Sequence, residues 1–143
     1  MQQPVFSPEQ ICTADDFNSV CLATFQFQYE ENPVYRSSCD LLHVSPVDVQ
    51  YINAIPYLPI QFFKSHKVRS VHNEPELFFS SSSTSGQGTS KHFIQDLSLY
   101  QKSFRLGFKL HYGEVKDWAI LALLPSYLER EGFSLIYMME DLI

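Results

Sequence analysis

A loop rich in hydroxyl groups and glycine, residues 80–92, carries the residue types best suited to holding an anion. It reads Ser-Ser-Ser-Ser-Thr-Ser-Gly-Gln-Gly-Thr-Ser-Lys-His and follows the short apolar run 77–79. Hydroxyls, backbone N–H groups and the Lys91 ammonium can all donate to phosphate oxygens, and a helix after the loop would add the positive end of its dipole. Composition alone favours a flexible Ser/Gly surface loop instead. The sequence around the loop is therefore needed to choose between an anion-binding loop and a flexible surface loop.

Charge is unevenly distributed along this chain, whose formal net charge is −6. Residues 61–112 carry seven basic and three acidic side chains, whereas residues 1–60 carry one arginine and seven acids. Such a basic excess raises the local concentration of anions. It is too small and too dispersed to predict a nucleic-acid-binding surface, which belongs to a basic domain. Lys102, Arg105 and Lys109 are better explained as the solvated face of a helix.

Length and composition predict one soluble globular domain or part of one, with 143 residues of which 45% are hydrophobic. No apolar run reaches the roughly 20 residues of a membrane-spanning helix, and the first residues lack the pattern of a secretory signal. We therefore expect a cytoplasmic protein. Cys12, Cys21 and Cys39 show neither C-x-x-C nor zinc-ligand spacing, so they are predicted to be structural thiols, and no metal site is predicted.

The first part of the chain is predicted to be helical. Thr13, followed three residues later by an aspartate, is typical of a helix start, and this helix is expected to reach about residue 29. A second helix is predicted over residues 32–42, with a proline in its first turn. The prolines of residues 45–59 indicate an irregular connector. We assign residues 1–57 to an N-terminal helical region.

The second part has the pattern of a β-α-β unit. Residues 76–80 resemble a strand, and apolar side chains at steps of three and four predict a helix from about residue 97 to the glycine at 113. The apolar run 118–124 suits a strand buried on both faces of a parallel sheet, and a last helix is predicted from Ser134, as N-cap, onward. Two parallel strands cannot cover their own faces and edges. We therefore expect an α/β fold that these residues leave incomplete.

Two segments besides the loop carry a family resemblance. The run 58–68 reads Leu-Pro-Ile-Gln-Phe-Phe-Lys-Ser-His-Lys-Val, and the run 121–130 reads Leu-Ala-Leu-Leu-Pro-Ser-Tyr-Leu-Glu-Arg. Together with the Ser/Thr/Gly loop they resemble the LuxE-type acyl-protein synthetases of the adenylate-forming superfamily. The resemblance spans roughly residues 30–143 and matches the N-terminal portion of that family. It implies that residues 58–143 begin the adenylate-forming core.

The resemblance also assigns a phosphate-binding role to the loop. The family's sequence there is approximately Ser-Ser-Gly-Thr-Thr-Gly, which aligns with residues 81–86. Ser85 keeps the hydroxyl of the usual threonine, whereas Ser83 adds a Cβ where the family has glycine and so weakens the expectation of ATP affinity. The phosphate-binding residues that the resemblance implies are Ser81, Ser82, Thr84, Ser85, Gly86 and Lys91.

The implied reaction is activation of a fatty acid. ATP and the fatty acid carboxylate give an acyl-adenylate and pyrophosphate, and the acyl group then passes to a protein thiol. ATP, with Mg²⁺, is the implied cofactor, and a fatty acid and an acyl-accepting protein are the implied partners. The adenine pocket and the acyl-accepting cysteine are expected after residue 143, so no catalytic residue is assigned and the isolated chain is expected to be inactive. Lys64, His66 and Lys67 match the family's run without a derived role.

Two alternatives stay open. The chain could be a non-catalytic remnant or interaction module that keeps the fold, a reading that its short length and Ser83 favour. A hydrolase using a loop serine is the weaker alternative because the chain has no Gly-x-Ser-x-Gly motif. In the incomplete fold, apolar side chains of the run 118–124 and of the last helix would lack cover. We therefore expect self-association through exposed apolar surface.

Overall fold

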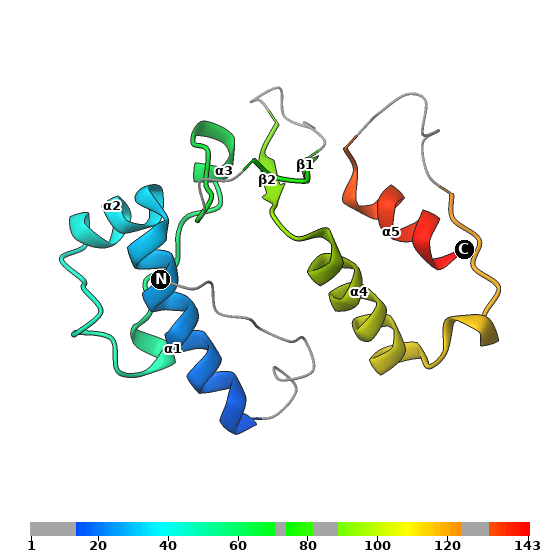
Figure 1. The fold of residues 1–143 in the computed structure, drawn as a ribbon, viewed down its shortest axis with the longest axis horizontal. Helices are drawn as coiled ribbons and strands as arrows, with labels where there is room; N and C mark the ends of the chain where they lie inside the picture. Colours follow the sequence, from blue (N-terminus) through cyan, green and yellow to red (C-terminus); the bar gives the residue numbers. More distant parts are fainter. Residues whose placement is uncertain (1–13, 71–73, 82–88, 124–131) are drawn as a thin grey trace. The chain divides into compact units, whose positions relative to one another are not determined.

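The computed structural model describes residues 14–70, 74–81, 89–123 and 132–143 (Figure 1). It contains two compact units, Met1–Glu74 and Pro75–Ile143, which are considered one at a time. None of the helices in the described ranges is long and apolar enough to cross a membrane. The assignment of residues 58–143 to an adenylate-forming core stays a prediction.

The first unit is helical, as predicted. Its elements are α1 (Ala14–Glu31), α2 (Pro33–Leu41), the 3-10 turn η2 (Ile52–Ala54) and the short helix α3 (Phe62–Ser65). The second helix starts where the sequence predicts, because the Asn32 side chain caps it by accepting a 3.1 Å hydrogen bond from the Tyr35 N–H. The expected cap of α1, Thr13, lies outside the described residues.

The core of the first unit forms where α1, α2 and the connector meet. Its buried side chains are Phe25, Tyr35, Cys39 and Val49. The Tyr35 hydroxyl donates a 2.6 Å hydrogen bond to the Pro56 carbonyl and so ties α2 to the connector. Cys39 is a fully buried free thiol, which fits the predicted structural role, and burial raises its pKa. Cys12 lies outside the described residues.

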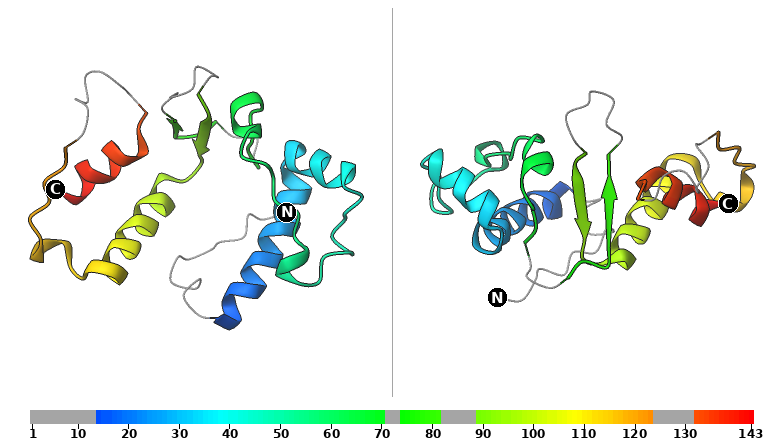
Figure 2. Two further views of the ribbon diagram at one scale, coloured as in Figure 1. Left: turned by 180° about the vertical axis from the view of Figure 1, so that it is seen from behind. Right: turned by 90° about the horizontal axis from the view of Figure 1, so that it is seen from above.

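The second unit contains a β-hairpin followed by two longer helices. Its elements are β1 (Leu77–Ser80), β2 (Lys91–Ile94), α4 (Leu97–Tyr112), the 3-10 turn η3 (Val115–Asp117) and α5 (Ser134–Leu142). The strands are antiparallel, with Leu77 opposite Ile94 and Ser80 opposite Lys91, and they lie side by side in Figure 2. Gly113, with a φ of 84°, ends α4 as predicted.

The predicted parallel β-α-β unit is wrong. The partner of β1 is β2, which directly follows the loop and which the sequence pattern did not indicate as a strand. Residues 118–123 of the expected second strand belong to no sheet, and residue 124 lies outside the described ranges. Leu121 is 96% exposed, so a continuous apolar run does not by itself produce a buried strand. The short loop allows β1 to pair locally, and local pairing has a lower chain-closure cost than a crossover.

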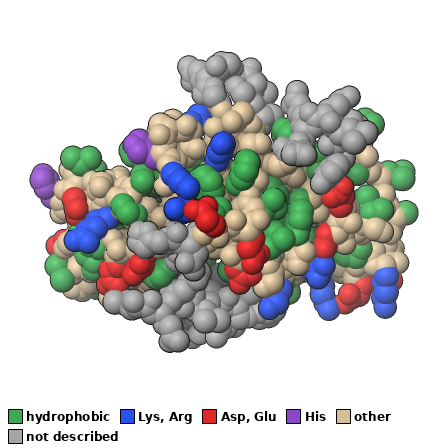
Figure 3. All heavy atoms as spheres, turned by 45° about the horizontal axis from the view of Figure 1, so that its top comes forward, with side chains coloured by type: hydrophobic (Ala, Val, Ile, Leu, Met, Phe, Trp, Pro, Cys, Tyr) green, Lys and Arg blue, Asp and Glu red, His purple; other side chains and the backbone are tan. Residues whose placement is uncertain are grey.

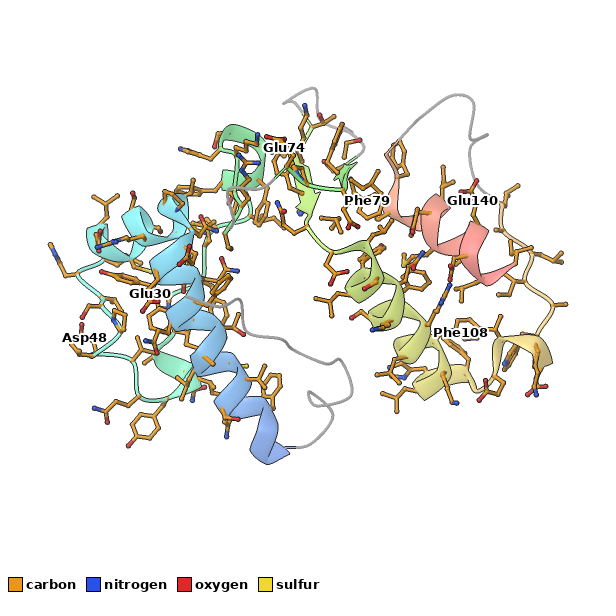
Figure 4. All side chains as sticks on the ribbon, viewed as in Figure 1. Glu30, Asp48, Glu74, Phe79, Phe108 and Glu140 are labelled. Atoms are coloured by element: carbon orange, nitrogen blue, oxygen red, sulfur yellow. The ribbon has the colours of Figure 1, made fainter. Side chains whose placement is uncertain are left out.

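The core of the second unit is aromatic. Phe79 of β1 is 5% exposed, and its ring centroid lies 5.0 Å from that of Tyr100 on α4 and 5.7 Å from that of Tyr137 on α5 (Figure 4). The guanidinium of Arg105 on α4 donates to both carboxylate oxygens of Asp141 on α5, with 2.7 Å from Nε to Oδ2. These contacts fix the hairpin and the two helices as one framework.

Charged side chains are mixed on the surface. On the face drawn in Figure 3, acidic, basic and apolar side chains are all exposed.

Candidate anion-binding site

The ends of the Ser/Thr/Gly loop are held together by two hydrogen bonds. The Ser81 N–H donates to the Ser90 carbonyl over 3.1 Å, and the Ser90 N–H donates to Ser81 Oγ over 3.0 Å. We call these two residues the neck of the hairpin. The predicted phosphate-binding residues between them, Ser82, Thr84, Ser85 and Gly86, lie outside the described residues. Ser81 and Lys91 are therefore the members of the predicted site that lie within the described residues: Ser81 bonds Ser90 at the neck, and Lys91 directly follows Ser90.

Lys91 lies on the outer face of the hairpin, directly after the neck. Side chains alternate between the faces of a strand, so Lys91 shares its face with Ser80, its cross-strand partner, and with Phe78. Its ammonium lies 5.2 Å from the centroid of the half-exposed Phe78 ring, which gives a cation–π contact. None of the salt bridges among the described residues involves Lys91. This exposed ammonium can therefore accept an anion as partner.

The inner face of the neck carries a residue that the sequence reasoning missed. Ser90 is only 6% exposed, and its Oγ lies 3.3 Å from Nε2 of the half-buried His92. Which of the two groups donates depends on the imidazole tautomer. His92 is opposite Phe79 in the hairpin and so lies over the aromatic core. The alternation of inward and outward side chains could have indicated this role once residues 91–94 were assigned to a strand.

Gly132 is a second residue that sequence reasoning missed. Its carbonyl accepts a 2.8 Å hydrogen bond from the Ser80 N–H, on the edge of β1 away from β2. The φ of Gly132 is 87°, and a Cβ there would lie 3.3 Å from Ser80 Oγ. Both facts favour glycine. No local signal could have found this contact, because the two residues are distant along the chain.

The helix dipole expected at the loop does not contribute, because a strand follows the loop and α4 starts only at Leu97. Two carboxylates already satisfy its N-terminus: Asp96 accepts from the Leu99 N–H over 3.0 Å, and Glu76 accepts from the Leu97 N–H over 2.9 Å. Hydrogen bonds from the Ser98 hydroxyl and the Leu99 N–H hold the pKa of Asp96 below its usual value. A phosphate would be repelled there, so the neck of the hairpin is the better anion site.

The basic run of the first unit has a different setting. Lys64, in the last turn of α3, and Lys67 are exposed. The His66 ring stacks on Phe62 with 5.0 Å between centroids, and its Nδ1 lies 2.8 Å from the Ser65 hydroxyl. These contacts explain the local structure of the run, and neither of them indicates a ligand. Within the ranges that the structure describes, no cluster of His, Cys, Asp or Glu could hold a metal ion.

A small pocket lies on the inner side of β1 against α5. Its volume is about 70 Å³, well below the roughly 300–1,000 Å³ of typical ligand pockets. It is lined by Leu77, Phe79, Gly132, Phe133, Ile136, Tyr137 and Glu140. This pocket is too small for a nucleotide.

Comparison with known proteins identifies the family. The family described as "Acyl-protein synthetase, LuxE" matches residues 6–112, which is well over half of the chain. The match includes the run 58–68, the loop and Lys91, whereas the run 121–130 lies beyond it. No curated protein and no solved structure matches the chain significantly. The chain therefore belongs to the LuxE acyl-protein synthetase family.

Proposed function

We propose that this chain takes part in the ATP-dependent activation of a fatty acid and the transfer of the acyl group to a protein thiol. In this proposal the hairpin holds the phosphate groups of ATP. The observation that carries it is the exposed Lys91 ammonium beside the neck of a loop rich in hydroxyl groups, in a chain of the acyl-protein synthetase family. The family supports the reaction class, and the hairpin supports the role of this part of the chain.

The donor set of the hairpin fits a phosphate group. Ser80 brings a hydroxyl to the end of β1, and Lys91, its cross-strand partner, brings a positive charge opposite it. When ATP is bound, its α-phosphate is the electrophile for the fatty acid carboxylate, and pyrophosphate leaves. The Lys91 ammonium would stabilise the negative charge that grows on the leaving phosphates, and the loop would orient them. Mg²⁺ would enter with ATP, as its counter-ion.

Binding of pyrophosphate and ATP to the 143-residue chain tests this role. Isothermal titration calorimetry should show weak binding that decreases as salt is added, because the contacts are exposed. Lys91→Ala should weaken it about tenfold, since a charge-assisted hydrogen bond is lost. Lys116→Ala is the matched control, because this exposed lysine lies in η3, at the end of α4 away from the hairpin (Figure 1). Equal binding by the wild-type chain and Lys91→Ala would remove the lysine from the site.

A non-catalytic interaction module is the second candidate function. It is favoured by Ser83 at a position where the family has glycine, and by the exposed apolar side chains of Trp118, Leu121 and Leu123. Fatty-acid-dependent exchange of pyrophosphate into ATP tests whether the chain alone can carry out the activation step. No catalytic residue is assigned within the chain, so the 143-residue polypeptide alone should stay at background. Exchange above background would show that the chain itself carries the activation step.

A further inference from the structure

We propose that His92 is a positioning residue, which fixes the neck of the hairpin through Ser90 and does not touch the phosphate itself. This inference rests on the proposed function, because it names how the same site is held in shape. It differs from the role given to Lys91, since His92 lies on the opposite, inner face of the hairpin.

Ser90 is the fixed point of the neck. Its N–H and carbonyl both bond to Ser81, and its hydroxyl meets His92 Nε2. A buried hydroxyl that loses its partner has a free-energy cost. At 6% exposure, Ser90 has little access to water as a substitute partner. The imidazole therefore stabilises the orientation in which Ser90 closes the neck.

His92 is itself held by the core of the second unit. Across the hairpin it faces Phe79, whose ring packs against Tyr100 of α4 and Tyr137 of α5. A phenylalanine at position 92 would fill a similar space. Only a side chain with a polar atom near the position of Nε2 can also reach the Ser90 hydroxyl. His92 thus connects the rigid aromatic core to the end of the loop.

The neck sets the backbone direction at two of the predicted phosphate-binding residues. Ser81 is the first predicted donor of the loop, and Lys91 directly follows Ser90. When the neck is closed, the backbone direction at both residues is set before an anion arrives. Without the His92 contact, the neck would have to be ordered during binding. That cost would lower the affinity although no charge is removed.

The experiment measures pyrophosphate binding to the full 143-residue chain by calorimetry, with thermal unfolding as a check on folding. His92→Phe should bind about fivefold more weakly, the effect of one lost hydrogen bond. His92→Gln should restore most of the affinity, because its terminal amide can reach the Ser90 hydroxyl. Ser90→Ala should weaken binding as much as His92→Phe, and the double variant should be no weaker than either single one, because the two residues act as one unit.

The possible outcomes separate this inference from the proposed function. If His92→Phe binds like the wild type, or if His92→Gln is as weak as His92→Phe, the positioning role is overturned while the anion site stands. Additive losses in the double variant would overturn it as well. If His92→Phe fails to fold, Ser90→Ala decides, and wild-type affinity in that variant overturns the inference. A wild-type chain that does not bind pyrophosphate would overturn both proposals.

Discussion

Gly132→Ala should destabilise the second unit by about 1–2 kcal/mol. The backbone of Gly132 has a φ of 87°, in the region that residues with a Cβ rarely adopt. Placing an L-residue in a left-handed conformation costs roughly 1–2 kcal/mol. The substitution changes no charge and removes no side chain, so this backbone cost should dominate the measured change in the free energy of unfolding.

The surroundings of Gly132 add a second, smaller cost. The new Cβ would lie 3.3 Å from Ser80 Oγ and 3.6 Å from the Phe78 carbonyl oxygen. The serine hydroxyl can rotate away, so this contact should add only a few tenths of a kcal/mol. The 2.8 Å hydrogen bond from the Ser80 N–H to the Gly132 carbonyl would then lengthen, which loosens the outer edge of β1.

Urea unfolding followed by tryptophan fluorescence is the assay. Trp118, the single tryptophan of the chain, lies in the second unit and donates from Nε1 to the Tyr112 carbonyl over 2.7 Å, so it reports on that unit. Gly107→Ala is the matched control: Gly107 lies inside α4 with nothing within 4 Å of an added Cβ. This control should raise stability by about 1 kcal/mol, the helix preference of alanine over glycine. A Gly132→Ala midpoint equal to or above that of the wild type would refute the reasoning.

Two further predictions concern α4 and the exposed apolar segment after it. The pKa of Asp141 is lowered by hydrogen bonds from Arg105, so the carboxylate contributes stability above its unfolded pKa of about 3.9 and loses that contribution as the pH falls towards its folded pKa. Acid titration of the urea midpoint should therefore show a steeper fall for the wild type than for Asp141→Asn. Leu121 and Leu123 are almost fully exposed, so Leu121→Asp with Leu123→Asp should reduce any self-association seen by light scattering at micromolar concentration. Unchanged scattering would place the contact elsewhere.

The helices could be predicted because their ends carry local signals. Asn32 followed by a proline specifies the start of α2, and Gly113 specifies the end of α4. Ser134 begins α5, although Phe133 and not Ser134 occupies the cap position. At the start of α2 and at the end of α4, the deciding signal comes from residues that are neighbours in sequence.

The strand β1 was predicted, but its partner strand and half of the candidate site could not be predicted in this way. Strand pairing joins residues that are distant in sequence, and the four residues of β2 are too few for a clear alternation. Lys91 was visible from its position after the hydroxyl-rich loop. His92 and Gly132 were not, because their roles depend on the hairpin register and on a contact between distant residues.

The hairpin is closed at its base as well as at its neck. Before β1, the Glu76 N–H donates to the Ile94 carbonyl and the Glu76 side chain accepts from the Leu97 N–H, which joins the start of the hairpin to the start of α4. The chain entropy that is lost when the two loop ends come together is therefore lost during folding, and not when a ligand binds. A ligand at the neck would therefore not have to bring the two strands together. Its affinity should consequently depend on the groups presented at the neck more than on changes elsewhere in the strands.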